Sequence, residues 1–288
     1  MKRSLKVFLA PILLSLAACG VQTSSPNQSA LDLNSSSTSI VGGQAVDTRD
    51  PIAKSIVALS HPFFGVFCTG VLVKKNVVLT AAHCTGLGND PRLIQVNFGT
   101  DLRGKLQSRK VLGGKTTDIW PNLTEAQMED LHAEWGDLAL LKFEGSAPAG
   151  YQPALILGDA SLLKEGLDVT LAGYGLTAMP DEDPRRLMKA VVKLTNPKLT
   201  PSEMEFDQYQ GKGACHGDSG GPAFATINGK LFLIGITSRS ASENGAETCQ
   251  EGSIYTSVAA HTNFLVQTAK FLDSPQFVPG KRIPQPGD

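Results

Sequence analysis

The chain has 288 residues, with 26 Lys and Arg against 27 Asp and Glu, so its formal net charge is -1. This length allows one large hydrophobic core or two small ones. The near-neutral charge, without any long basic cluster, argues against nucleic-acid binding, and we expect no nucleic-acid partner.

Residues 1–19 have the features of a bacterial secretion signal. Three cationic residues precede an apolar stretch over 7–16, which is too short to span a bilayer as a mature helix. The stretch leads into Leu16-Ala17-Ala18-Cys19, which resembles a lipobox, in which the cysteine is acylated. A plain signal peptide ending near Ala18 is the alternative. We expect secretion across the inner membrane, with the precursor held at the cell envelope or outer membrane by lipid on Cys19.

Residues 20–39 are rich in Ser, Thr, Asn and Gln. A segment of this composition buries too little apolar surface to fold, so we expect a disordered tether or propeptide.

From residue 40 onward, short aliphatic and β-branched runs alternate with turn residues, as in an all-β barrel or sandwich. The stretch 124–134 interrupts this pattern with helical character, and we interpret it as a surface insertion. The runs lie at 56–59, 71–73, 77–79, 93–96, 169–172, 190–194 and 231–236.

The C-terminal end predicts one helix and a tail. Val258, Leu265, Ala269 and Leu272 recur at helical spacing, so one face of a helix over 258–272 should pack on the second half of the chain. Residues 275–288 contain four prolines, which cannot continue that helix. We expect this Pro-rich tail to be loose.

The segment Gly217-Asp218-Ser219-Gly220-Gly221-Pro222 sets a serine in a glycine-flanked turn. A serine hydroxyl becomes a nucleophile when a neighbouring base takes its proton and backbone N–H groups hold the oxyanion. His83 follows the apolar run 77–80 and is the candidate base. Asp137 opens another apolar strand and is suited to orient the imidazole.

The order His83, Asp137, Ser219 resembles that of the trypsin and chymotrypsin family of serine endopeptidases, and three further motifs strengthen the resemblance. It implies two antiparallel six-stranded β-barrels with a C-terminal helix, within a domain over 40–274 and with the active site between the barrels. Protein or peptide substrates are implied, and we expect no metal or other cofactor. The further motifs are Ile40-Val41-Gly42-Gly43, Ala172-Gly173-Tyr174-Gly175 and Ser253-Ile254-Tyr255-Thr256.

The resemblance also implies an oxyanion hole and an activation step. The backbone N–H groups of Gly217 and Ser219 would form the oxyanion hole. A cut between Ser39 and Ile40, made by another protease or by the protein itself, would free an amino group to pair with Asp218.

Apart from Cys19 the chain has four cysteines, Cys68, Cys84, Cys215 and Cys249. An even set in a secreted protein indicates disulfides and an oxidising compartment, although four cysteines allow three pairings. The resemblance selects Cys68 with Cys84 and Cys215 with Cys249. A metal site is the competing interpretation, but the sequence has no Cys-x-x-Cys spacing.

The resemblance maps Gly213 to the base of the primary specificity pocket and Ser240 and Ser253 to its walls. A pocket without a carboxylate disfavours basic substrate residues, so we expect small or medium uncharged ones. An acidic preference is the alternative, with Thr237, Ser240 and His216 as donors. The hydroxyl of Ser238 should help to orient Asp137.

Two other functions share these features: a protease-shaped binding module without activity, and an esterase. Because all three reactive residues are present, we expect an active endopeptidase. We also expect a monomer that is extracellular or periplasmic once activated.

Overall fold

The computed structural model describes residues 40–288 except 87–89, 105, 176–185, 243–248 and 250. The predicted signal over 1–19, Cys19 and the predicted tether over 20–39 lie outside the described residues. None of the helices in the described part is long and apolar enough to cross a membrane.

The first half of the domain is a closed antiparallel barrel of six strands in the order β2-β3-β4-β7-β6-β5. Aliphatic side chains of these strands are fully buried, so the apolar runs of the sequence form its interior. The strands are β2 (Ile56–His61), β3 (Gly65–Lys74), β4 (Val77–Thr80), β5 (Gln95–Phe98), β6 (Gln107–Thr116) and β7 (Ala139–Phe143).

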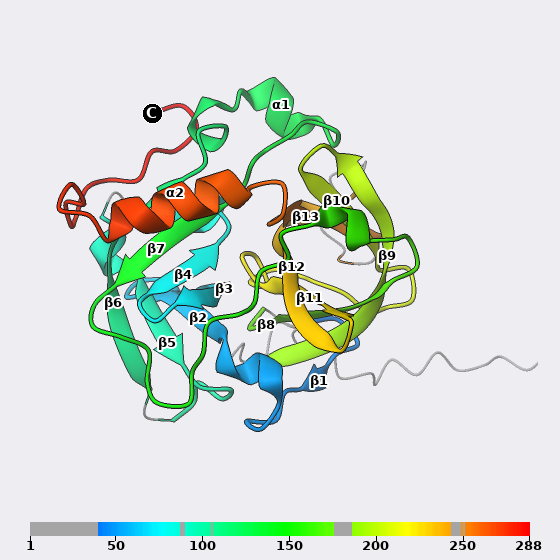
Figure 1. Cartoon of the computed structure of the whole chain (residues 1–288), viewed down its shortest axis with the longest axis horizontal. Helices are drawn as coiled ribbons and strands as arrows, with labels where there is room; N and C mark the ends of the chain where they lie inside the picture. Colours follow the sequence, from blue (N-terminus) through cyan, green and yellow to red (C-terminus); the bar gives the residue numbers. More distant parts are fainter. Residues whose placement is uncertain (1–39, 87–89, 105, 176–185, 243–248, 250) are drawn as a thin grey trace, which may run out of the picture. The chain divides into compact units, whose positions relative to one another are not determined.

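The second half is also a closed antiparallel barrel, ordered β8-β9-β10-β13-β12-β11 and closed by the pairing of β11 with β8. A short strand, β1 (Gln44–Ala45), pairs with β9 at its edge. Figure 1 shows the two barrels side by side, which confirms the predicted fold. The strands are β8 (Asp168–Gly173), β9 (Met188–Thr200), β10 (Glu203–Asp207), β11 (Pro222–Ile227), β12 (Lys230–Ser240) and β13 (Gly252–Ser257).

Helices are few. In the predicted insertion, α1 spans only Glu125–Glu129 and begins with a capping box formed by Thr124 and Gln127. The single-turn 3-10 helices are η1 (Pro51–Lys54), η2 (His83–Thr85), η3 (Pro91–Leu93), η4 (Trp120–Asn122) and η5 (Ala160–Leu162).

The C-terminal helix α2 (Thr262–Leu272) packs on the first barrel, so its expected placement on the second barrel was wrong. It contacts β7, and the carbonyl of Leu272 accepts a 2.6 Å hydrogen bond from Lys142 Nζ of that strand. The apolar spacing correctly located the buried face, including Leu265, but such a pattern carries no information about which surface covers it.

The expectation of a loose tail was also wrong. Ile283 is only 3% exposed and belongs to the same core cluster as the first barrel. The amide of Gly280 donates a 2.7 Å hydrogen bond to the carbonyl of Leu112. Proline stops the helix, but it does not prevent an irregular segment from packing.

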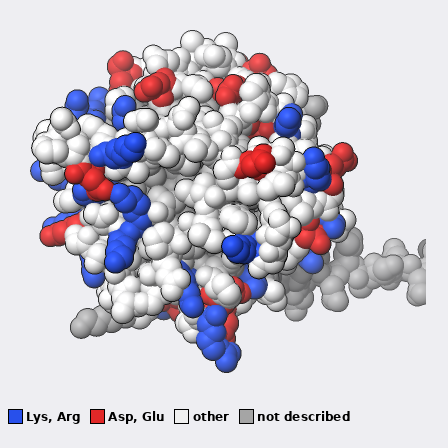
Figure 2. Space-filling view, viewed as in Figure 1, with Lys and Arg blue, Asp and Glu red and all other residues white. Residues whose placement is uncertain are grey.

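On the face shown in Figure 2, acidic and basic side chains are interspersed near the periphery. This face carries no extended patch of one sign.

Candidate active site

His83 and Asp137 are neighbours because β4 and β7 pair antiparallel, with Thr80 opposite Ala139. His83 lies three residues after the end of β4, and Asp137 lies two residues before the start of β7. The two segments therefore emerge from the same edge of the first barrel.

The carboxylate of Asp137 is fully buried and receives three hydrogen bonds from the site. Its Oδ1 accepts from the backbone N–H of His83 at 3.0 Å, and its Oδ2 lies 2.8 Å from His83 Nδ1. The hydroxyl of Ser238 donates to the same Oδ2 at 2.7 Å. This arrangement keeps the proton on Nδ1 and leaves Nε2 of the neutral ring as an acceptor.

Each partner shifts the pKa of the other. Burial opposes a charge on His83, but the attraction and hydrogen bond of Asp137 outweigh it, so the pKa of His83 lies above its ordinary value. Burial likewise opposes ionisation of Asp137, but the charge of His83 and the three hydrogen bonds hold the pKa of this carboxyl below its ordinary value.

Ser219 comes from the second barrel, in the loop between β10 and β11. Its carbonyl accepts a 2.8 Å hydrogen bond from the amide of Thr69 and lies 3.6 Å from Cys84 Sγ, the residue after His83. The next residue, Gly220, has a φ of +78°, and a Cβ there would lie 2.0 Å from Thr80 Oγ1. Only glycine allows the serine loop to approach the end of β4 this closely.

Asp218 points away from solvent and is fully buried. Its oxygens accept hydrogen bonds of 2.9 Å each from the amides of Gly175 and Cys215, and the backbone N–H of the fully buried Ile40 also donates to it. Burial nevertheless raises the pKa of Asp218 to about 7. The carboxyl is enclosed so closely that a Cβ at Gly175 would lie 2.6 Å from it.

The two predicted disulfides are present: Cys68 bonds to Cys84, and Cys215 bonds to Cys249. One adjoins His83, and the other holds a segment four residues before Ser219. Both indicate folding in an oxidising compartment.

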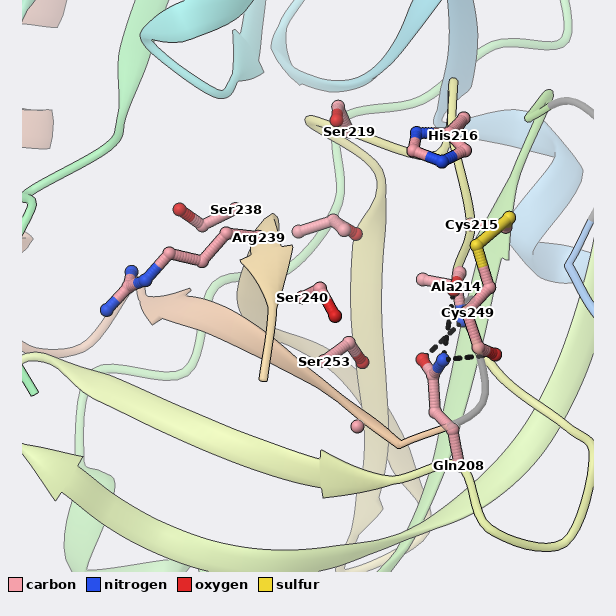
Figure 3. Close-up of a pocket in the computed structure, with 12 residues that line it drawn as sticks. Gln208, Ala214, Cys215, His216, Ser219, Ser238, Arg239, Ser240, Cys249 and Ser253 are labelled. Carbon is pink, nitrogen blue, oxygen red and sulfur yellow. Dashed lines mark hydrogen bonds between the residues drawn. A yellow bond between two sulfur atoms is a disulfide. The ribbon is translucent and has the colours of Figure 1, made fainter. Parts of the chain in front are cut away.

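A cavity of about 240 Å³ opens beside Ser219 and contains the three predicted pocket serines Ser238, Ser240 and Ser253 (Figure 3). The hydroxyl of Ser253 is buried. The other lining residues are Gln208, Ala214, Cys215, His216, Thr237, Arg239, Cys249 and Gly252.

Gln208, which the sequence reasoning missed, forms the floor of this cavity (Figure 3). Its Oε1 accepts from the amide of Ala214 at 2.7 Å, and its Nε2 donates to the carbonyls of Ala214 and Cys249, each at 3.0 Å. Gly213 is not among the lining residues, and a Cβ there would lie 2.1 Å from Gln208. The glutamine amide thus occupies the space that a side chain at 213 would need.

Arg239, also missed, follows Ser238 and is anchored beside the site. Its guanidinium pairs with both oxygens of the fully buried Glu203, at 2.7 and 2.9 Å, and lies 4.4 Å from the centre of the Trp135 ring. No sequence motif marks this pair, since 36 residues separate its members.

Comparisons with known proteins agree with this geometry. The family model described as Trypsin matches residues 40–265. A protein named Trypsin from Saccharopolyspora erythraea is 31% identical over 240 residues, which cover 79% of this chain and 97% of that protein. Vitamin K-dependent protein C from Oryctolagus cuniculus is 24% identical over 223 residues, which cover 69% of this chain and 45% of that protein. The chain therefore belongs to the trypsin family of serine proteases.

Proposed function

We propose that this protein is a serine endopeptidase that hydrolyses peptide bonds through an acyl-enzyme. Ser219 Oγ attacks the substrate carbonyl while His83 Nε2 takes its proton, and His83 then gives the proton to the leaving amine. Water next attacks the ester, again with His83 as base, and frees Ser219. The observation that carries the proposal is the buried Asp137, which His83 and Ser238 approach within 2.8 Å beside the Ser219 loop.

In this proposal the amides of Gly217 and Ser219 hold the oxyanion. Gly217 has a φ of +86°, and its carbonyl is held by a 3.1 Å hydrogen bond from the Thr69 hydroxyl. A fixed carbonyl restricts rotation of the peptide groups around it, which favours preorganised donors.

The test is covalent labelling by a fluorophosphonate probe, combined with peptide hydrolysis, on the full chain after processing. The parent protein should be labelled and Ser219→Ala should not. The matched control is Ser161→Ala, an exposed serine in η5. An unlabelled, correctly folded parent protein would favour an inactive binding module, and labelling with hydrolysis of esters but not peptides would favour an esterase.

We further propose that the protein is made as a precursor and activated by cleavage before Ile40. The buried N–H of Ile40 donates to Asp218, and the partners of this buried carboxyl in the described part of the chain are backbone hydrogen-bond donors. Cleavage would turn this amide into an ammonium group facing a carboxylate, and removal of one partner from such a buried pair costs about 3 to 5 kcal/mol. N-terminal sequencing of the active form should begin at Ile40.

For the substrate we propose a preference for small or medium uncharged residues before the cleaved bond. The floor is the neutral amide of Gln208, and a buried cation would find no carboxylate among the described lining residues. The acidic alternative is weakened because the Thr237 hydroxyl already donates to the carbonyl of Gly221 at 3.0 Å. Hydrolysis of a peptide library would distinguish the two preferences.

We also propose that the precursor is secreted and anchored through lipid on Cys19, so that cleavage before Ile40 releases a monomeric protease from the envelope. The two disulfides support an oxidising destination but join no cysteine to residue 19. Membrane and soluble fractions should contain the uncut and cut forms, respectively. Sedimentation of the cut form measures its oligomeric state.

A further inference from the structure

The C-terminal tail continues beyond the family match, which ends at residue 265. It runs along the first barrel (Figure 1), where the Phe277 ring lies 6.2 Å from the Phe271 ring. Ile283 is 3% exposed and belongs to the apolar cluster that includes the core of that barrel. This path brings Gln285 to the segment that carries His83.

The side-chain amide of Gln285 connects two separate segments. Its Oε1 accepts a 3.1 Å hydrogen bond from the indole Nε1 of Trp120, and its Nε2 donates a 2.8 Å bond to the hydroxyl of Thr85. The same Nε2 lies 3.3 Å from the carbonyl of Ile283, which fixes the amide from its own side.

Both partners adjoin the candidate base. Thr85 lies two residues after His83 in η2, and its hydroxyl donates to the carbonyl of Ala82, just before His83, at 2.7 Å. The Trp120 ring is 5% exposed and lies 6.3 Å from the imidazole, centre to centre. Gln285 therefore joins the backbone turn of His83 to the aromatic wall beside its ring.

The turn itself is short. η2 has three residues and no side-chain hydrogen bond at its N-terminal cap, and a single 3-10 turn is a weak local structure. Asp137 restrains His83 through Nδ1 and the backbone amide, and the disulfide to Cys68 holds Cys84. Gln285 adds a side-chain hydrogen bond at Thr85, the last residue of the turn.

We propose that Gln285 is a positioning residue for His83, which makes the C-terminal tail part of the catalytic machinery. The proposal rests on the proposed function, in which His83 is the general base. Small displacements of a catalytic group reduce the rate sharply, so the effect should fall on the chemical step rather than on substrate binding.

The test replaces Gln285 with methionine, which is similar in shape but lacks both hydrogen-bonding groups. Gln285→Met should lower kcat and the rate of fluorophosphonate labelling about ten-fold at unchanged KM. The matched control is Gln276→Ala, an exposed glutamine of the same tail, which should stay within about two-fold of the parent protein. Thr85→Val removes the partner hydroxyl, so Gln285→Met should cost less in that background, since the two changes disrupt one contact.

A purely structural tail gives a different result: Gln285→Met would lower Tm while kcat and the labelling rate stay within about two-fold below the melting range. That result would overturn the proposal. NMR of isotope-labelled histidine, assigned with His83→Ala, separates this failure from failure of the proposed function. If the parent protein is not labelled by the probe, the proposed endopeptidase function is wrong. The NMR comparison still tests the positioning proposal in that case: a changed line width or titration of the His83 signal in Gln285→Met supports it, and an unchanged signal contradicts it.

Discussion

Ser238 Oγ donates a 2.7 Å hydrogen bond to Asp137 Oδ2, the oxygen that also faces His83. The second barrel thus contributes directly to the carboxylate that orients a residue of the first barrel. Neither barrel alone contains the complete hydrogen-bonding arrangement.

Ser238→Ala should lower kcat/KM roughly 10- to 100-fold, since hydrogen bonds to charged groups contribute roughly 1.5 to 3 kcal/mol. The matched control is Ser55→Ala, a buried serine that donates to the carbonyl of Ile52 and is remote in sequence from the site. The control should change stability with little effect on kcat/KM. Steady-state kinetics and thermal melting measure both quantities, and equal kinetics for the two variants would contradict the prediction.

The pH profile should reflect the raised pKa of His83. The base must be neutral, so kcat/KM should fall with decreasing pH around a midpoint above 6.5, the ordinary imidazole value. Asp137→Asn removes the attraction that raises this pKa, and should lower both the midpoint and kcat, the latter by roughly 10⁴. Kinetics between pH 4 and 9 measure both, and a midpoint below 6.5 in the parent protein would be inconsistent with the pairing.

The same pair affects stability with a definite sign. Asp137 stabilises the fold above its ordinary pKa of 3.8, and this contribution is lost as pH falls through its lowered folded value. His83 stabilises the fold below 6.5, and its contribution is lost as pH rises through its raised folded value. The stability difference between the parent protein and Asp137→Asn should therefore be largest between these two ordinary values, as urea unfolding can measure.

Asp218 should make the uncut chain less stable as pH rises. The pKa of Asp218 in the folded state, about 7, exceeds its ordinary value of 3.8, so the folded state holds the proton more tightly than the unfolded state does. The free energy of unfolding therefore decreases as the pH rises from 3.8 to about 7. The effect should reach up to about 4 kcal/mol and be absent in Asp218→Asn. Urea unfolding at pH 4 and pH 7 measures it, with Ser219→Ala in both chains to prevent self-processing. Parallel curves for the two chains would disprove this assignment.

Gln208→Ala should deepen the specificity pocket. Relative kcat/KM for leucine or phenylalanine over alanine before the cleaved bond should rise about ten-fold, because each added methylene contributes roughly 1 to 3 kcal/mol in an apolar pocket. The control Gln210→Ala removes an exposed glutamine that does not line this cavity. Peptide-library kinetics compare the three proteins, and unchanged selectivity in Gln208→Ala would show that another residue sets the depth.

Gly213→Asp should fail to create cleavage after Lys or Arg. The Cβ of the new residue would lie 2.1 Å from the Gln208 side chain, so the carboxylate cannot take its place at the pocket base while Gln208 is present. The expected result is a lower Tm with no gain on basic substrates, measured on the same library. Efficient cleavage after Arg in the single variant would contradict this account.

The sequence predicted those features of the structure that depend on short local patterns of residues. The apolar runs predicted strands, and the order of the motifs indicated a family resemblance, which implied the two barrels and both disulfide pairings. The same signals could not identify Gln208 or the pair of Arg239 and Glu203. These residues act through contacts between distant segments, and no local pattern distinguishes a buried glutamine or arginine from an exposed one.

The C-terminal end illustrates the same limit. Its prolines correctly ended the helix, but the tail's packing depends on Ile283 meeting a barrel built from residues far earlier in the chain. Likewise, the spacing of Leu265 and Leu272 predicted that one face of the helix is buried, but not which barrel it packs against. The composition of the tail excludes a helix, but whether the tail packs depends on the shape and polarity of the barrel surface that it meets.

The apolar cluster that contains the core of the first barrel also includes three residues from the last part of the chain, Leu265, Leu272 and Ile283. During synthesis, strands β2 to β7 leave the ribosome long before these side chains do, so the first barrel lacks these apolar contacts until the C-terminal residues have been made. The barrel that carries His83 and Asp137 therefore gains its full set of apolar contacts only after the second barrel has been synthesised. A chain whose translation stops before the tail would carry both residues in an unfinished barrel.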